Sequence, residues 1–387
     1  MQVIASNLGG ASIRRLKADT IKILQWKDLA DSYSDSLLLG NGASIAISPS
    51  FNYASLYDAA SSHGFIDQQT KGLFDSFSIK DFEYVLRRLA DTNHVNQILQ
   101  ISEDITASAY DSLKNALVQT VQTVHPEYGD VLPELEAISK FMTHFRTVVN
   151  LNYDLLVYWA MLRGNELLKA TWFKDGFFYE QEDKALTFHS DYGFMYEPIS
   201  SAKGATLVFY PHGNLVLAKG WVGKEEKISK DRSDCLLSEI LSQWNMNHYT
   251  PLFISEGNTE QKHLAIGRSD YLNVVYNKVL PDVGDSLVIY GWAFGDQDAH
   301  ILKALDRHQP ARIAVSVHMH NDEWRDYCHH VKAAIDSCYR LKHCHLDFFD
   351  SESEEVWMKC TRFKHPPEEN LSVRPASAIV IPKMAQS

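Results

Sequence analysis

The sequence predicts an α/β protein with a Rossmann-like, mostly parallel sheet, helices on both faces and a helical insertion. From Val208 onward, short apolar runs alternate with helical patterns of about 10 to 20 residues, which is typical of a parallel sheet. Several apolar runs end directly in glycine or polar residues, and open parallel sheets bind ligands at these strand ends. A long stretch near residues 64–146 has helical spacing and almost no strand pattern.

The composition excludes several functional classes. The chain has 387 residues, of which 45% are hydrophobic and 22% charged, as in ordinary globular proteins. Its net charge of −12 makes nucleic acid an improbable partner for the chain by itself. No apolar run reaches the roughly 20 residues of a membrane span, and the N-terminus lacks the apolar core of a secretory signal. The five cysteines form no CxxC pair, so we expect a cytoplasmic chain with reduced thiols and no structural zinc.

The first informative stretch is a strand that runs into glycines. The apolar run Leu37–Leu39 is followed by Gly-Asn-Gly-Ala-Ser, which predicts a strand, a tight turn and the start of a helix. Glycines let the backbone approach a ligand, the first helical N–H groups favour an anion, and a serine can cap them. Ordinary turns also contain this pattern. The expected phosphate-binding loop consists of Gly40, Asn41, Gly42, Ala43 and Ser44.

The regions around this stretch set the predicted domain boundaries. Residues 21–33 read as a short amphipathic lead-in, and residues 50–57 as a capped helix. Helical spacing within the insertion predicts helices near 81–89, 104–124 and 131–145, which either pack over the site or contact a partner. The expected units are an α/β domain over 20–350, the helical insertion over 64–146, and a polar, proline-containing tail over 351–387.

The second stretch follows the next predicted strand. A β-branched run beginning at Thr147 ends in Asn152-Tyr153-Asp154, and an apolar helical pattern follows. Short polar residues at the carboxyl end of a strand are placed to contact a ligand. They are equally suited to cap the following helix, so both interpretations remain open for Asn152 and Asp154.

Two further strand ends carry candidate residues. Residues 205–210 predict a strand that runs into Pro-His-Gly, which makes His212 a catalytic candidate, although a lone histidine is usually structural. Residues 286–290 predict a strand that ends in a turn containing Gly291, Phe294 and Asp296.

Other expected elements are helices over 234–244, 261–280, 299–307 and 322–340, and strands over 251–255, 313–317 and 344–349. Six later histidines match no zinc spacing.

Taken in order, these four stretches resemble the sirtuin superfamily, specifically its bacterial sirtuin-like NAD-hydrolase branch. Sirtuins carry Gly-Ala-Gly-x-Ser, then Gln-Asn-x-Asp, then His-Gly, and the sirtuin-like branch often has Asn-Tyr-Asp as its second motif. The resemblance implies that the Gly40–Ser44 loop binds the pyrophosphate. It further implies that Asn152 orients the nicotinamide ribose and the water, with Asp154 in support, and that His212 is the general base. Gly291, Phe294 and Asp296 would flank the adenosine half.

The resemblance also implies an activity and partners. We expect hydrolysis of NAD to ADP-ribose and nicotinamide without a metal, in antiphage defence by NAD depletion. Relatives of this kind act as homo-oligomers or with a DNA-translocating ATPase encoded nearby. The chain lacks the paired CxxC motifs that hold zinc in peptide-deacylating sirtuins. An NAD-dependent protein deacylase and a non-catalytic NAD or ADP-ribose sensor are the main alternatives, and a nuclease subunit is a weaker one.

Overall fold

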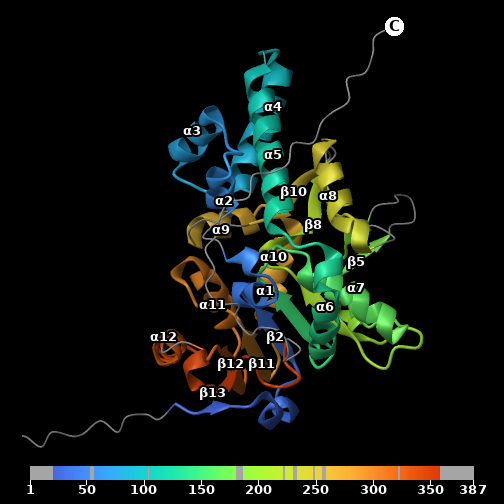
Figure 1. The fold of residues 1–387 in the computed structure, drawn as a ribbon, viewed down its shortest axis with the longest axis vertical. Coiled ribbons are helices and arrows are strands. Elements are labelled where there is room, and N and C mark those ends of the chain that lie inside the picture. Colours follow the sequence, from blue (N-terminus) through green and yellow to red (C-terminus); the bar gives the residue numbers. More distant parts are fainter. Residues whose placement is uncertain are drawn as a thin grey trace, which may run out of the picture.

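The computed structural model describes residues 21–357, except residues 53–55, 103, 180–185, 221–222, 230–232, 247–248, 255–258 and 321–322. Its body contains two β-sheets, and a helical region rises above them (Figure 1). The predicted lead-in contains a short strand and two 3₁₀ turns. Part of the expected helix over 50–57, and the tail beyond residue 357, lie outside the described residues.

A parallel sheet forms the centre of the molecule. In the described residues it has eight strands: β1 (Ile23–Leu24), β2 (Ser36–Leu39), β3 (Thr147–Asn150), β4 (Phe173–Lys174), β7 (Thr206–Phe209), β11 (Ser286–Tyr290), β12 (Arg312–Val317) and β13 (His345–Asp350). Their order is β1-β13-β12-β11-β2-β3-β7-β4, and all neighbouring strands pair in parallel. Every residue of β2, β3, β7 and β11 is buried, because such a sheet is covered on both faces. The predicted fold class is confirmed.

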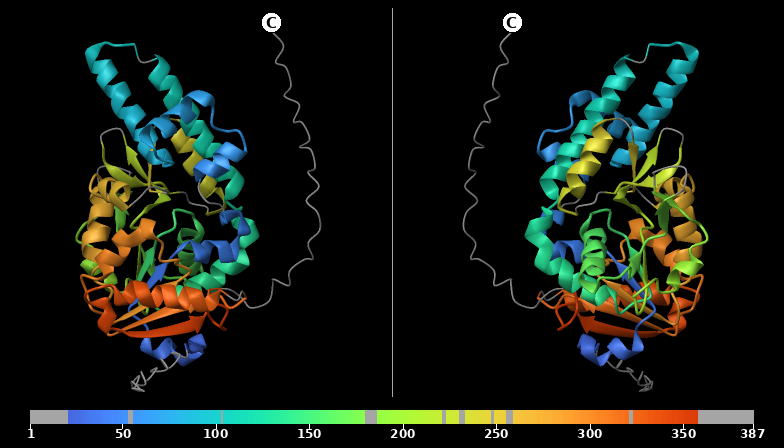
Figure 2. Two further views of the ribbon diagram at one scale, coloured as in Figure 1. Left: turned by 90° about the vertical axis from the view of Figure 1, so that its left-hand side faces the viewer. Right: turned by 90° about the vertical axis from the view of Figure 1, so that its right-hand side faces the viewer.

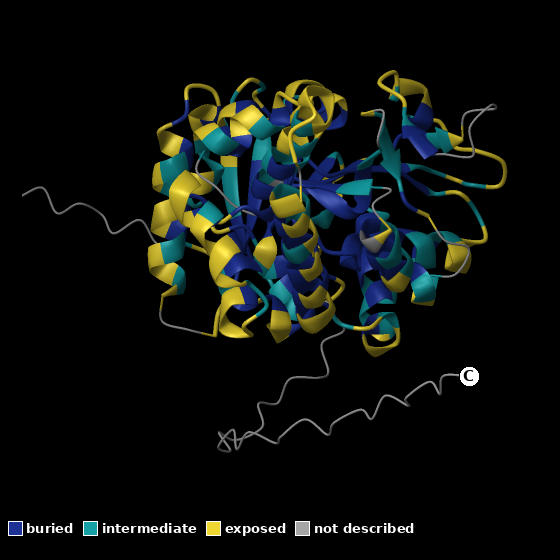
Figure 3. Ribbon diagram, turned by 90° about the horizontal axis from the view of Figure 1, so that it is seen from above, coloured by how far each residue is buried: buried dark blue, intermediate teal, exposed yellow. Residues whose placement is uncertain are grey.

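The order of the strands creates a crevice beside β2. From β2 the chain moves outward through β3 to β7 on one side, and later through β11 to β12 and β13 on the other. Open α/β sheets bind ligands where the strand order reverses in this way. Helices cover the parallel sheet, so the sheet forms a buried layer in the interior (Figure 3). They include α1 (Asn41–Ile47), α6 (Tyr128–Met142), α7 (Leu156–Leu168), α11 (Ala299–Leu305) and α12 (Trp324–Asp336).

The chain between β2 and β3 is helical, as predicted. It contains α2 (Leu56–Ser62), α3 (Gln68–Phe77), α4 (Phe82–Leu99), α5 (Asp104–Val124) and α6. Phe82, Val85, Leu86 and Leu89 form a buried face of α4, as the helical spacing near residues 81–89 predicts. Helices α4 and α5 form a long hairpin that projects beyond the sheets (Figure 2), whereas α6 packs against α7.

A second, antiparallel sheet was not predicted. In the described residues its strands are β5 (Phe177–Tyr179), β6 (Leu186–Phe188), β8 (Gly213–Gly220), β9 (Glu225–Lys227) and β10 (Tyr249–Phe253), in the order β10-β8-β9-β6-β5. The strand expected over 251–255 therefore belongs to this sheet and not to the parallel one. Strand β9 lies in a charged segment for which the sequence predicted no strand. Helix α8 (Leu236–Asn245) lies near its predicted position and packs against β10.

The single helix expected over 261–280 is divided. Helix α9 (Thr259–Ile266) ends before Gly267, and α10 (Asp270–Val274) begins after Ser269, whose hydroxyl accepts a hydrogen bond from the Leu272 amide. This serine cap begins a new helix within the apolar pattern. A π-helical turn over Val275–Val279 follows.

In the described part of the chain, we find no helix with both the length and the hydropathy of a membrane-spanning segment.

The packed core extends past residue 350. Val356 and Trp357 are buried, and Trp357 Nε1 donates a 2.7 Å hydrogen bond to the Ala43 carbonyl in α1. The start of the segment predicted as a peripheral tail therefore holds the helix that follows β2.

Candidate functional site

A cavity of about 930 Å³ lies at the carboxyl ends of β2, β3, β11 and β12, where the strand order reverses. Its volume is within the range of roughly 300 to 1,000 Å³ that is usual for small-molecule sites. Residues from all four predicted stretches line it. They include Gly40, Asn41, Gly42, Asn152, Asp154, His212 and Gly291.

The first and fourth predicted stretches pack together as one unit. The Gly42 amide donates a 2.7 Å hydrogen bond to the Gly291 carbonyl, and a Cβ on Gly42 would lie only 2.8 Å from that oxygen. A Cβ on Gly40 would lie 2.8 Å from Trp292 Cβ. Gly291 itself has a φ of +69°, which favours glycine. The glycines are therefore required where two turns meet backbone to backbone, independently of any ligand.

We expect Gly42→Ala to lower the free energy of unfolding by about 1 to 3 kcal/mol, because the added methyl group displaces the Gly291 backbone. Gly72→Ala is the matched control. Gly72 also lies in a helix, but a Cβ there meets nothing within 4 Å, so alanine should stabilise α3 by up to about 1 kcal/mol. Denaturant unfolding of both variants measures the difference. Equal stability of the two variants would mean that the turns do not pack as described.

Asn152 is held in place by its amide nitrogen. Nδ2 donates to the Gly40 carbonyl at 3.0 Å and to Ser44 Oγ at 2.8 Å, so both amide hydrogens are used. The oxygen Oδ1 is the atom that remains for a ligand at this cavity-lining residue. The loop that follows β2 therefore holds the Asn152 side chain at the cavity wall.

Asp154 combines the two interpretations that the sequence left open. One oxygen accepts the Ser44 hydroxyl at 2.5 Å, and the other accepts the Leu156 amide at the start of α7 at 2.9 Å. Burial raises the pKa of the Asp154 carboxyl, although these two hydrogen bonds oppose the shift. Asp154 thus supports both Asn152, through Ser44, and the helix that follows.

Ser44 differs from its expected role. It lies inside α1, and the N-cap position is Gly40, which makes no side-chain cap. Ala43, Ser44, Phe294 and Asp296 are not among the residues that line the cavity. Phe294 is buried against Trp292, with ring centroids 4.2 Å apart. Besides Gly291, the turn after β11 reaches the cavity through Trp292, Ala293, Gly295 and Gln297.

His212 lies where the chain passes from the parallel sheet to the antiparallel one. Its carbonyl accepts a 2.7 Å hydrogen bond from the Ile254 amide beyond β10. Gly213 follows with a φ of +76°, a conformation that favours glycine, and a Cβ there would collide with the Leu252 carbonyl oxygen in β10. The Leu151 backbone lies beside the His212 ring and acts to raise its pKa. The junction of the two sheets therefore fixes this imidazole at the cavity wall.

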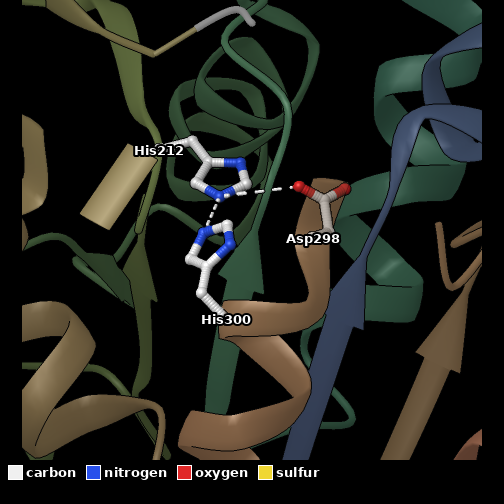
Figure 4. Close-up of side chains that lie close together, drawn as sticks. All are labelled: His212, Asp298 and His300. Carbon is white, nitrogen blue, oxygen red and sulfur yellow. Dashed lines mark hydrogen bonds and ion pairs between the residues drawn. The ribbon is translucent and has the colours of Figure 1, made fainter. Parts of the chain in front are cut away.

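Three residues that the sequence analysis missed surround His212. His212 Nε2 lies 2.8 Å from His300 Nε2 and 4.0 Å from Asp298 Oδ1 (Figure 4). Lys262 Nζ lies 2.7 Å from the same Asp298 oxygen. Lys262 and Asp298 line the cavity. Asp298 and His300 follow the turn that the sequence singled out, whereas no pattern marks Lys262.

The charges of this group follow from its burial. Burial lowers the pKa of His212 to about 3, and the Lys262 charge acts in the same direction while Asp298 opposes it. Burial likewise lowers the pKa of His300 to about 4. Burial alone would raise the pKa of Asp298, but His212 and the Lys262 ammonium, which bonds to this carboxylate, hold it below its usual value. At neutral pH both rings are neutral and Asp298 is ionised.

Among the described residues, His212, Asp298 and His300 form the group whose arrangement suits a metal ion. One ligand atom from each lies within 4.8 Å of the others. The histidines of residues 318–345 are exposed, and two of them lie near the surface carboxylate of Glu352. In that region His320 Nε2 lies 2.8 Å from one oxygen of Glu352, and His318 Nδ1 lies 3.6 Å from the other.

Residues 37–357 match the family described as Domain of unknown function (DUF4917). The chain belongs to this family. The match begins in β2 and ends at Trp357, so it includes the parallel sheet from β2 onward, the insertion, the antiparallel sheet and every cavity-lining residue. No curated protein matches the sequence.

Proposed function

We propose that this protein hydrolyses NAD to ADP-ribose and nicotinamide. The observation that carries the proposal is the meeting of Asn152, His212 and the Gly40–Gly42 turn at one cavity beside β2. These residues are far apart in the sequence and were singled out from it separately. The cavity volume of about 930 Å³ is sufficient for a dinucleotide, and its position is where α/β sheets bind nucleotides.

The chemistry of this bond suits the residues present. The nicotinamide of NAD is cationic and leaves as a neutral molecule, while positive charge develops on the ribose. The protein must hold the ribose and accept a proton from the attacking water or a ribose hydroxyl. Asn152 Oδ1 is free to accept a hydrogen bond from such a hydroxyl. A protein-bound metal is not part of this proposal.

His212 is the proposed base, acting through Nε2. The Leu151 backbone lies beside the ring and favours a proton on it. Because Nε2 faces His300, we assign the ring proton to Nδ1, and the Nε2 lone pair can accept a proton from the substrate once the His300 ring no longer donates to it. The two phosphate charges of bound NAD would raise the pKa of His212 from its low value in the empty cavity. Asp298, 4.0 Å from Nε2, would stabilise the protonated ring.

The wider role rests on the resemblance to sirtuin-like NAD hydrolases. We propose that the activity serves bacterial antiphage defence by depleting cytoplasmic NAD. A homo-oligomer, or a complex with a DNA-translocating ATPase encoded nearby, is the proposed active form.

Incubation of the purified chain with NAD, alone and together with the product of the neighbouring gene, tests the proposal. Chromatography should resolve nicotinamide and ADP-ribose in equal amounts. NAD binding without products under every condition would favour a sensor. Nicotinamide release that requires an acylated peptide would favour a deacylase. Either result would contradict the proposed hydrolysis.

A further inference from the structure

The two buried histidines beside the cavity share an unusual contact. Their Nε2 atoms face each other at 2.8 Å, and Asp298 Oδ1 lies 4.0 Å from His212 Nε2 (Figure 4). Ligand atoms bound tetrahedrally to one ion, with bonds near 2.1 Å, lie about 3.4 Å apart. The two observed separations lie on either side of this value. Small side-chain shifts would therefore bring all three atoms within bonding distance of one ion.

The hydrogen bonding of the two rings leaves one atom unsatisfied. Because His212 is assigned its proton on Nδ1, the contact requires His300 to donate from Nε2. His300 Nδ1 is then unprotonated, and it is buried without a hydrogen-bond partner among the described residues. If an ion replaced the proton between the rings, that proton would move to Nδ1. The Gln297 carbonyl beside the His300 ring could then accept it, as backbone carbonyls do for many metal-binding histidines.

We propose that His212, Asp298 and His300 bind a divalent transition-metal ion of the zinc type. Two imidazole nitrogens and one carboxylate oxygen are typical ligands for Zn²⁺ and Co²⁺, whereas Mg²⁺ prefers oxygen ligands throughout. His212 and Asp298 line the cavity, so a fourth coordination position would face the ligand space. This is the arrangement of an open site, not of a closed structural one.

Lys262 weakens the binding of an ion at this site, so the ion can be released again. Its ammonium group lies 2.7 Å from Asp298 Oδ1 and competes with an ion for that oxygen. Because Lys262 neutralises the only carboxylate of the three ligands, the ion gains less from the site than it would from an unpaired aspartate. Removal of the lysine charge should therefore tighten metal binding, which no adventitious surface site would do.

An ion at this site would regulate the enzyme. It would occupy Nε2 of His212, the atom assigned as the base, and so inhibit NAD cleavage. This consequence rests on the proposed function, whereas metal binding itself does not. The two can therefore be tested separately.

The test titrates the full chain, freed of metal by a chelator, with Co²⁺ and Zn²⁺. Visible absorbance of Co²⁺ and calorimetry with Zn²⁺ should each show one ion per chain, with no comparable binding of Mg²⁺. His300→Gln should weaken binding by more than the roughly 10- to 100-fold caused by loss of an outer partner. Lys262→Met should tighten it. His320→Ala is the matched control, because His320 pairs with Glu352 on the surface, and it should leave the affinity unchanged.

Several results would overturn the site. These are no binding of Co²⁺ or Zn²⁺, equal binding of Mg²⁺, and an affinity lost in His320→Ala but kept in His300→Gln. Thermal melts report whether the variants fold. If His300→Gln fails to fold, Asp298→Asn tests a second proposed metal ligand in its place. If Zn²⁺ binds at the site but leaves NAD cleavage unaffected, the predicted inhibition is wrong and the metal site is still confirmed. If the wild type never cleaves NAD, the proposed function fails, and the titration still decides the metal site.

Discussion

His212→Ala and Asn152→Ala are each expected to lower the rate of NAD cleavage by about 10²-fold or more. The first change removes the proposed base, and the second removes the oxygen that orients a ribose hydroxyl or the water. Both side chains line the same cavity. The measurement is the rate of nicotinamide release under conditions in which the wild type turns over, together with NAD affinity by calorimetry and a thermal melt.

NAD binding should persist in His212→Ala, because the remaining cavity wall is intact. If both residues act on one transition state, the double variant should lose much less than the product of the two single losses. His308→Ala is a suitable control, since His308 bonds to the Gly284 carbonyl and does not line the cavity. A folded His212→Ala variant with wild-type turnover would show that His212 is a structural histidine and that the mechanism is wrong.

Trp357→Ala should lower the free energy of unfolding by about 3 to 5 kcal/mol. The indole is only 1% exposed, its centroid lies 5.5 Å from that of Tyr290, and its Nε1 bonds to the Ala43 carbonyl. The substitution leaves a large cavity beneath α1. Denaturant unfolding gives the change in stability.

Tyr339→Ala provides the comparison for this prediction. Tyr339 is 76% exposed, so its loss should change stability by no more than about 0.5 kcal/mol. If Trp357→Ala were equally mild, residues 351–357 would not belong to the core, and the tail would begin where the sequence analysis placed it.

Local patterns in the sequence were sufficient for the central strands of the parallel sheet. The apolar runs of β2, β3, β7 and β11 are buried on both faces, and such strands read as continuous hydrophobic segments. The helices of the insertion were also recognisable, because the apolar residues of an amphipathic helix recur every three or four positions along the sequence. Strand ends followed by polar residues then identified Asn152 and His212 as cavity residues. Their part in NAD cleavage stays a prediction.

The antiparallel sheet required the tertiary structure. Apart from β8, which has eight residues, its strands have three to five residues, and they lie between Phe177 and Phe253. Strand β8 pairs both with nearby β9 and with more distant β10. Such pairing depends on register between segments and leaves little local signal. The same limitation applied to the core beyond residue 350, where the burial of Trp357 depends on its contact with α1.

The surroundings of His212 were also decided only by the fold. Lys262 and His300 lie on helices whose spacing gives no sign of a functional role, yet the structure brings His300 to the ring of His212 and Lys262 to Asp298. The glycines near β2 show the same division. Their sequence predicted a turn, but their need for the smallest side chain comes from the turn after β11, about 250 residues later, because two backbones can approach this closely only without Cβ atoms.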